Sequence, residues 1–151
     1  MPENMNPTAQ KLMTAFKQFH SIRKKSPVTD LKSSEVWVLF CIKKRVSPDS
    51  PGIKVSDISS ALHVAAPTIT QLINSLDANG YVERATDKED RRAVRIRLTD
   101  KGEQAMMKAS ESFSESFNGL VDYLGEEKGN ELAELLSMVF TYFDEQKKDN
   151  F

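Results

Sequence analysis

The sequence lacks most of the features that enzyme sites and extracellular domains need. Cys41 is the single cysteine in 151 residues, which excludes an internal disulfide framework and a cysteine-based metal cluster within one chain. The sequence has no glycine-rich phosphate loop, nucleophile elbow or cluster of metal ligands, so we expect no enzymatic activity, no cofactor and no metal. No apolar run approaches the roughly 20 residues that span a bilayer, and the N-terminus lacks a signal-peptide pattern. We therefore expect a cytoplasmic protein that does not engage a membrane.

Charge is nearly balanced over the whole chain but uneven along it. The formal net charge is -1. Residues 1–45 carry nine Lys or Arg against three acids, whereas residues 102–151 carry four against eleven. The acidic C-terminal segment is therefore not expected to touch a polyanion. The length and the 39% hydrophobic content favour a single domain.

Apolar residues recur at helical spacing through most of the chain. Helices are predicted over residues 9–20, 33–44, 56–62, 67–79, 99–123 and 126–146. Serines could cap the second and third of these helices, and Thr99 and Asp100 could start the fifth. Gly80 is expected to end the fourth helix as a left-handed C′ residue. In the fifth helix, Met106, Phe113, Phe117 and Leu120 are expected to be buried.

The last helix has the most regular apolar stripe, formed by Leu132, Leu135, Leu136, Val139, Phe140 and Phe143. Such a stripe could form an intrachain core. We favour its completing an intermolecular helical bundle.

Residues 80–102 predict a β-hairpin with a basic outer surface. In the outgoing strand, residues 93–98, apolar Val94, Ile96 and Leu98 alternate with Arg95 and Arg97. Residues 84–97 carry six cations against three acids in a chain of net charge -1. Such a patch suits a polyanion, and nucleic acid is the commonest one. A merely solvated turn is the alternative.

Two short helices joined by HVAAP and followed directly by a hairpin describe a winged helix-turn-helix. Its second helix fits the major groove of about 12 Å, while the hairpin reaches the backbone or the neighbouring minor groove. In residues 67–79, Ile69, Leu72, Ile73 and Leu76 must face inward. The outward face is then Thr68, Thr70, Gln71, Asn74, Ser75 and Ala78.

The run HVAAPTITQLINSLDANGYVERATDKEDRRAVRIRLTDKG resembles the DNA-binding core of the MarR (multiple antibiotic resistance regulator) family. The most specific part is D-x-x-D-R-R followed by a strand and L-T-x-K-G. The resemblance implies a mainly α fold with a small β-hairpin wing, in one domain covering residues 1–151. Residues 33–99 would form the winged-helix lobe, and residues 1–28 and 100–151 the helical dimerisation region.

The resemblance also implies a function: a homodimer that binds a pseudo-palindromic operator in double-stranded DNA, usually as a repressor. The recognition-helix residues that it assigns are Pro67, Thr68, Thr70, Gln71, Asn74 and Ser75. The wing residues are Arg84, Lys88, Asp90, Arg91, Arg92 and Arg95. Arg92 matches the arginine that enters the minor groove. Asp90 matches the acid that braces the wing, expected to pair with Arg91 or Arg92.

The recognition segment departs from the family pattern because residues 64–79 contain no Lys or Arg. Gln71 and Ser75 stand where relatives often carry arginines, and the cap position holds Ala65 or Ala66. The wing and the basic N-terminal half are therefore expected to supply most of the salt-dependent affinity. Gln71 and Asn74 remain suitable base readers, because an amide can bond both N6 and N7 of adenine.

The aromatic residues of the first two helices, the single cysteine and the uncharged recognition segment each allow two interpretations. The aromatic residues Phe16, Phe19, His20 and Trp37 could line a pocket for a small-molecule effector, phenolic or otherwise aromatic, that releases the DNA; core packing is the default at this spacing. Cys41 could be a redox sensor, but a small buried hydrophobe on its helix is favoured. The uncharged recognition helix also allows a winged-helix module that binds protein and has lost DNA affinity.

Overall fold

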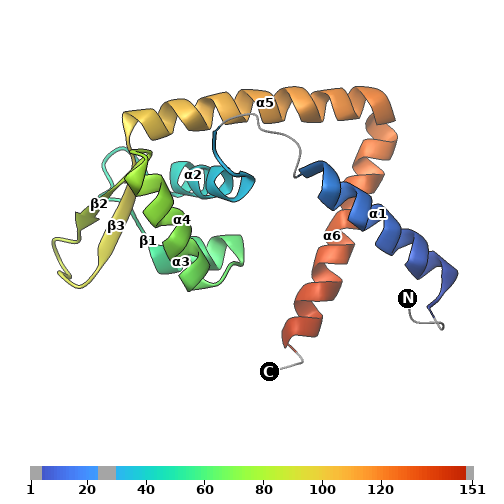
Figure 1. The fold of residues 1–151 in the computed structure, drawn as a ribbon, viewed down its shortest axis with the longest axis horizontal. Coiled ribbons are helices and arrows are strands. Elements are labelled where there is room, and N and C mark those ends of the chain that lie inside the picture. The colour runs from blue at the N-terminus through green and yellow to red at the C-terminus, as the bar shows by residue number, and fades with distance from the viewer. Residues whose placement is uncertain (1–4, 24–29, 149–151) are drawn as a thin grey trace. The chain divides into compact units, whose positions relative to one another are not determined.

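The computed structural model describes residues 5–23 and 30–148 and confirms a mainly α-helical chain with a small sheet (Figure 1). The elements in chain order are α1 (Pro7–Arg23), α2 (Ser33–Arg45), β1 (Ile53–Lys54), α3 (Val55–Leu62), α4 (Ala66–Ala78), β2 (Val82–Thr86), β3 (Val94–Leu98), α5 (Asp100–Leu124) and α6 (Glu126–Lys148). The chain divides into two compact units between Ala109 and Ser110. No helix among the described residues is long and apolar enough to cross a membrane.

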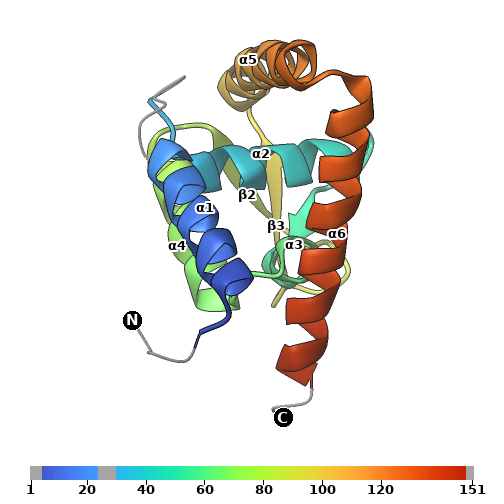
Figure 2. The same cartoon turned by 90° about the vertical axis from the view of Figure 1, so that its right-hand side faces the viewer.

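Helices α2, α3 and α4 pack on one another and on the sheet to form a single core, the winged-helix lobe (Figures 1 and 2). The predicted inward face of α4 is confirmed, since Ile69, Ile73 and Leu76 are at most 1% exposed. Helix α2 contributes Leu39 and Ile42 to the same core. Burial of such side chains stabilises a fold by about 1.5–3 kcal/mol each. The core therefore fixes which face of α4 remains outside.

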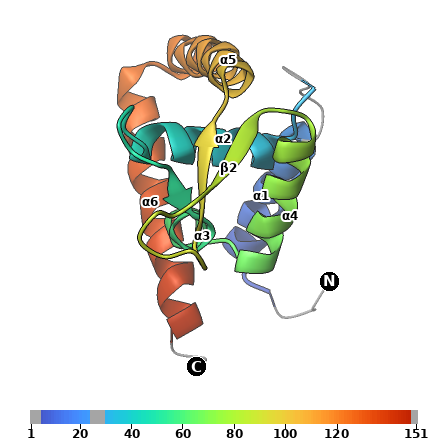
Figure 3. The same cartoon turned by 90° about the vertical axis from the view of Figure 1, so that its left-hand side faces the viewer.

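The sheet is antiparallel, with strand order β1-β3-β2. The predicted hairpin is formed by β2 and β3, which lie side by side in Figure 3. The two-residue β1 was not predicted. Ile96 is fully buried and pairs with Ile53 of β1. Val94 pairs with Thr86 at the end of the ladder and is 44% exposed, so the apolar face of β3 is buried only in part. The hairpin thus projects past the core.

The helix starts differ in part from expectation. The N-cap residues of α2 and α3 are Lys32 and Lys54 rather than the neighbouring serines. At α2 the carboxylate Oε2 of Glu35 instead accepts the Lys32 backbone N–H at 2.9 Å, which satisfies a donor that the helix leaves unpaired. The predicted start of the fifth helix is confirmed, since α5 begins at Asp100. The Oγ1 of Thr99, just before it, accepts the Gly102 N–H at 3.1 Å.

The junction between α4 and the hairpin is a Schellman turn. Gly80 has φ +77°, the left-handed conformation that glycine adopts without strain. The Tyr81 N–H donates to Leu76 O at 2.9 Å, and the Gly80 N–H donates to Asp77 O at 3.0 Å. The predicted C′ role of Gly80 is confirmed. This turn leads the chain from α4 into β2 within four residues, so helix and wing share one scaffold.

The second unit exposes its apolar residues. Helix α6 buries no residue within this chain, and Leu135, Leu136 and Phe143 are at least half exposed. The stripe of α6 is therefore not an intrachain core. The expected burial of Phe117 and Leu120 on α5 is also wrong for this chain, since they are 60% and 41% exposed.

Candidate nucleic-acid interface

The outward face of α4 is polar and uncharged along most of its length. Thr68, Thr70, Gln71 and Asn74 are exposed, as is Pro67 in the first turn. The Thr70 hydroxyl donates to the carbonyl of the residue four before it at 3.0 Å, within the helix. The N-cap, Ala65, makes no side-chain cap hydrogen bond, as the sequence predicted. This face can present amide and methyl groups to a base edge but little charge to a phosphate.

Ser75 differs from its predicted companions because it faces the core side. It is half-buried, and its Oγ donates to Oε1 of Glu35 at 2.7 Å. The Glu35 side chain is buried, and its second oxygen accepts the Lys32 N–H. One carboxylate thus joins the start of α2 to the middle of α4. Sequence reasoning missed Glu35; the available signal was an acid in the first turn of a helix.

Arg84 on β2 joins the hairpin to α4. Its Nη2 donates to Oδ1 of Asn74, and its Nε lies 3.3 Å from Oδ2 of Asp77. Asn74 and Asp77 are three residues apart on α4, a spacing that places both on one face. The guanidinium therefore contacts both while remaining 41% exposed. The acid of α4 nearest the wing is neutralised within the lobe.

The D-x-x-D-R-R motif folds into two successive Asx turns. Oδ1 of Asp87 accepts the Glu89 N–H, and Oδ1 of Asp90 accepts the Arg92 N–H, both at 3.0 Å. Short acidic side chains bond the backbone two residues on in this way. The Asp87 N–H donates to Ala93 O at 3.0 Å and closes the loop. The loop, residues 87–93, together with β2 and β3 is called the wing below.

The acid that braces the wing by an ion pair is Asp87, not Asp90. Arg95 reaches Oδ2 of Asp87 through Nε at 2.8 Å and Nη2 at 2.7 Å, and its Nη1 donates to Gly52 O at 3.4 Å. The Glu89 N–H and then Arg95 hold the pKa of Asp87 below its ordinary value. The predicted pairing of Asp90 with Arg91 or Arg92 is wrong: its side chain accepts a backbone N–H instead.

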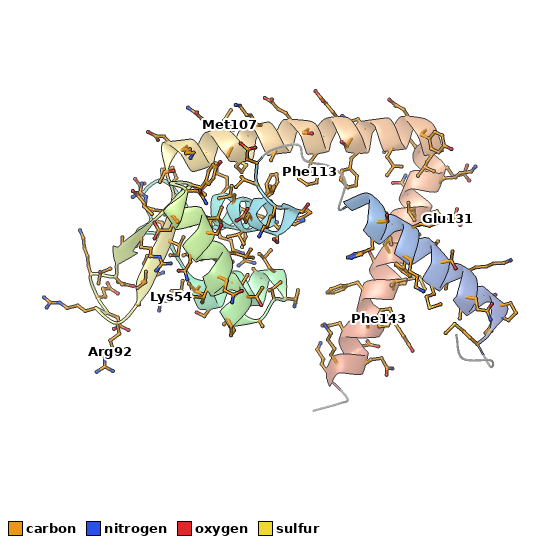
Figure 4. The ribbon with its side chains drawn as sticks, viewed as in Figure 1. Lys54, Arg92, Met107, Phe113, Glu131 and Phe143 are labelled. Atoms are coloured by element: carbon orange, nitrogen blue, oxygen red, sulfur yellow. The ribbon has the colours of Figure 1, made fainter. Side chains whose placement is uncertain are left out.

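The cations of the loop remain open to an incoming polyanion. Lys88, Arg91 and Arg92 are exposed, and Figure 4 shows Arg92 at the far end of the wing, directed away from the helices. On the strands, Arg97 pairs with Glu83 across the hairpin at 3.1 Å. The loop therefore concentrates positive charge beside the neutral face of α4.

The residues proposed for an effector site are exposed in the structure. Phe16, Phe19 and His20 are exposed on α1, and Trp37 is exposed on α2. None of them lines a pocket of about 460 Å³ near β1 and α3. Cys41 is 8% exposed, and burial raises the pKa of its thiol, which agrees with the buried-hydrophobe interpretation.

Comparison with known proteins identifies the family. The family model described as the MarR family matches residues 31–94, which include α2 through the first residue of β3. The uncharacterized HTH-type transcriptional regulator YpoP of Bacillus subtilis (strain 168) is 32% identical over 98 residues, which cover 65% of this chain and 69% of YpoP. The chain belongs to the MarR family.

Other comparisons agree on the fold. The HTH-type transcriptional regulator TtmR of Methylorubrum extorquens (strain PA1) is 44% identical over 54 residues, covering 36% of this chain but 28% of the length of TtmR. The S. aureus MepR–DNA complex matches with a TM-score of 0.72 at 21% identity, covering 92% of this chain and 99% of MepR. TtmR and YpoP are both named as transcriptional regulators, in agreement with the expectation that this MarR-family chain is not an enzyme.

Proposed function

We propose that this protein is a dimeric, sequence-specific DNA-binding transcriptional regulator. The observation that carries the proposal is the combination, within one lobe, of an exposed uncharged α4 face and a wing whose loop exposes Lys88, Arg91 and Arg92. A helix of this kind suits the major groove, and a cationic hairpin suits phosphates or a narrow minor groove. Residues 33–99 form the DNA-binding lobe in this proposal. Membership of the MarR family supports it.

The residues that the resemblance assigned to DNA fall into two groups in this proposal, those that contact DNA and those that position the contacts. Thr68, Gln71 and Asn74 are the proposed base readers, with Pro67 and Thr70 beside them. Lys88, Arg91 and Arg92 are the proposed backbone and minor-groove contacts. Ser75, Arg84, Asp90 and Arg95 already serve bonds within the lobe, so we assign them to positioning these contacts.

The proposed dimer is formed by the helices outside the lobe, α1, α5 and α6. Their large apolar side chains are exposed within one chain, at 44% for Phe16, 60% for Phe117 and 58% for Phe143, the last labelled in Figure 4. Large apolar side chains exposed along each of these helices support the proposal that they form an interaction surface. A second copy of the chain also gives the two-fold symmetry that a palindromic operator requires.

The regulatory mode is proposed as repression released by a small aromatic molecule. Phe16, Phe19, His20 and Trp37 stay the candidate effector residues, and their exposure within one chain leaves them able to line a site completed by dimerisation. Quenching of Trp37 fluorescence by a phenolic acid, and its loss in Phe19→Ala, is the expected result. Unchanged fluorescence at millimolar concentration across simple phenolic acids would remove this effector class.

The test of DNA binding is selection of bound duplexes from a random pool at low salt. We expect enrichment of a palindrome whose half-site centres lie about one helical turn apart, roughly 34–36 Å. Sedimentation of the free protein should give twice the mass of 17.0 kDa. A protein that retains no duplex at low salt would contradict the proposal.

The absence of Lys and Arg from residues 64–79 favours one second candidate, a winged-helix module that binds a protein partner. The same selection separates the two functions. Enrichment of a palindrome supports the regulator, and no retention of any duplex supports the module.

A further inference from the structure

We propose that Arg84 orients Asn74 with its NH₂ group toward the DNA, so that α4 selects guanine over adenine at the base pair facing Asn74. The inference rests on the DNA-binding function proposed above. It concerns specificity, because Arg84 would shape the base preference of a neighbouring residue without contacting the base itself.

The geometry places one guanidinium against two side chains of α4. Arg84 donates from Nη2 to Oδ1 of Asn74 and lies against Asp77 through Nε at 3.3 Å. Arg84 is held by β2, which follows α4 through the Schellman turn at Gly80. Among the residues that the structure describes, Nδ2 of Asn74 has no hydrogen-bond partner, and Asn74 is exposed on the outward face. The amide therefore turns its oxygen to Arg84 and leaves its NH₂ group open.

The orientation of this amide follows from donor and acceptor chemistry. A guanidinium carries only donors, so the amide must present its oxygen to Arg84. Reading adenine with two bonds needs both ends of the amide, since the oxygen accepts from N6 while the nitrogen donates to N7. Arg84 takes one of the two lone pairs of Oδ1 and holds the oxygen toward β2, so the NH₂ group is the end of Asn74 left to face the groove. Guanine presents two adjacent acceptors there, N7 and O6.

An ordinary stabilising role does not account for this arrangement. The Arg84–Asp77 pair is about two-fifths exposed on both sides, and ion pairs at that exposure contribute little to folding. A role in stability alone predicts that loss of Arg84 weakens binding to all duplexes equally. The specificity role predicts a change at one base pair of each half-site.

The experiment compares the full-length wild type with Arg84→Met, Asn74→Ala and Arg97→Met in selection from a random duplex pool. Arg97→Met is the matched control, because Arg97 is an equally exposed wing arginine that pairs with Glu83 rather than with α4. Asn74→Ala should flatten the preference at one position per half-site, which identifies the base pair that Asn74 reads. The wild type should favour guanine at that position.

At that same position we expect Arg84→Met to raise adenine relative to guanine by about tenfold, equal to about 1.4 kcal/mol. Arg97→Met should lower affinity without changing any preference, because it removes the same charge but leaves Asn74 oriented. Melting curves matching the wild type would show that the variants fold.

Three results would overturn the inference: a wild-type preference for adenine at the Asn74 position, an unchanged ratio in Arg84→Met, or the same shift in both arginine variants. Each leaves the proposed function standing, because the wild type still enriches a palindrome. Failure of the wild type to retain any duplex at low salt is distinct, and would overturn the proposed function and the inference together.

Discussion

The buried carboxylate of Glu35 gives a sharp prediction about how α4 is held. Replacing Ser75 with alanine removes the donor to Oε1 of Glu35, a bond of 2.7 Å inside the lobe. A hydrogen bond to a charged group contributes about 1.5–3 kcal/mol, and an unpaired buried acceptor keeps its desolvation cost. Alanine returns less than about 0.7 kcal/mol through its higher helix propensity. We expect Ser75→Ala to lower the free energy of unfolding by about 1–2.5 kcal/mol.

The matched control is Ser137→Ala, the same substitution within α6. The Ser137 hydroxyl is exposed and donates to Ala133 O at 2.9 Å, so its loss should change the free energy of unfolding by no more than about 0.5 kcal/mol. Urea unfolding followed by fluorescence measures both. Trp37 is the single tryptophan of the chain and lies on α2, two residues after Glu35, so its fluorescence reports on the lobe. Protein concentration must be held fixed, because dimerisation shifts apparent stability.

Two results would show that Ser75 does not hold α4 to Glu35. Equal midpoints for Ser75→Ala and Ser137→Ala would show that the bond to Glu35 contributes nothing. A double-mutant cycle with Glu35→Ala isolates the pair, since partners that interact directly give non-additive effects. Full additivity of Glu35→Ala and Ser75→Ala would contradict direct coupling of α2 to α4.

Three further predictions follow from single sites. A Cβ on Gly102 would lie 2.0 Å from Tyr81 O, so Gly102→Ala should destabilise the protein by several kcal/mol in thermal unfolding. A Cβ on Gly119, also on α5, would meet no atom within 4 Å, so Gly119→Ala should stabilise the protein by about 0.5–1 kcal/mol. Equal effects of the two substitutions would contradict the close approach of Gly102 to Tyr81. The pKa of Asp87 lies below its ordinary 3.8, so the contribution of Asp87 to the order of the wing is complete above that pH and is lost as the pH falls through the lower folded pKa. ¹⁵N relaxation of the loop should show its order decreasing over that pH range, and Asp87→Asn should abolish this pH dependence. The buried Cys41 should react with a thiol reagent far more slowly in the native protein than in urea; equal rates would revive the redox hypothesis.

The sequence predicted the elements whose signals are local and periodic. The i, i+3, i+4, i+7 spacing of Ile69, Leu72, Ile73 and Leu76 places the core face of α4 correctly. Gly80 predicted the turn into the wing, because a left-handed residue is needed there. Strand β1 was not predicted, because two residues are too few to show the alternation of apolar and polar side chains. The strand forms through pairing with Ile96 of β3.

The partners of polar side chains were predicted less well, because they are set by tertiary contacts. Ser75 lies beside the core stripe, and only the buried Glu35, 40 residues earlier, shows that its hydroxyl turns inward. Asp87 and Asp90 are equivalent in the motif, but register places Asp87 rather than Asp90 against Arg95. Arg84 and Asn74 meet because a turn folds β2 back beside α4.

In the proposed function, the wing supplies the electrostatic part of DNA affinity while neutral α4 residues supply specificity. The decisive measurement is the salt dependence of binding to the selected palindrome for wild type, Arg92→Ala and Gln71→Ala. The slope of log K against log salt changes by about 0.9 for each phosphate neutralised. We expect Arg92→Ala to make the slope shallower by about that amount for each wing, and Gln71→Ala to change base preference without changing the slope. A slope unaffected by Arg92→Ala would contradict the account.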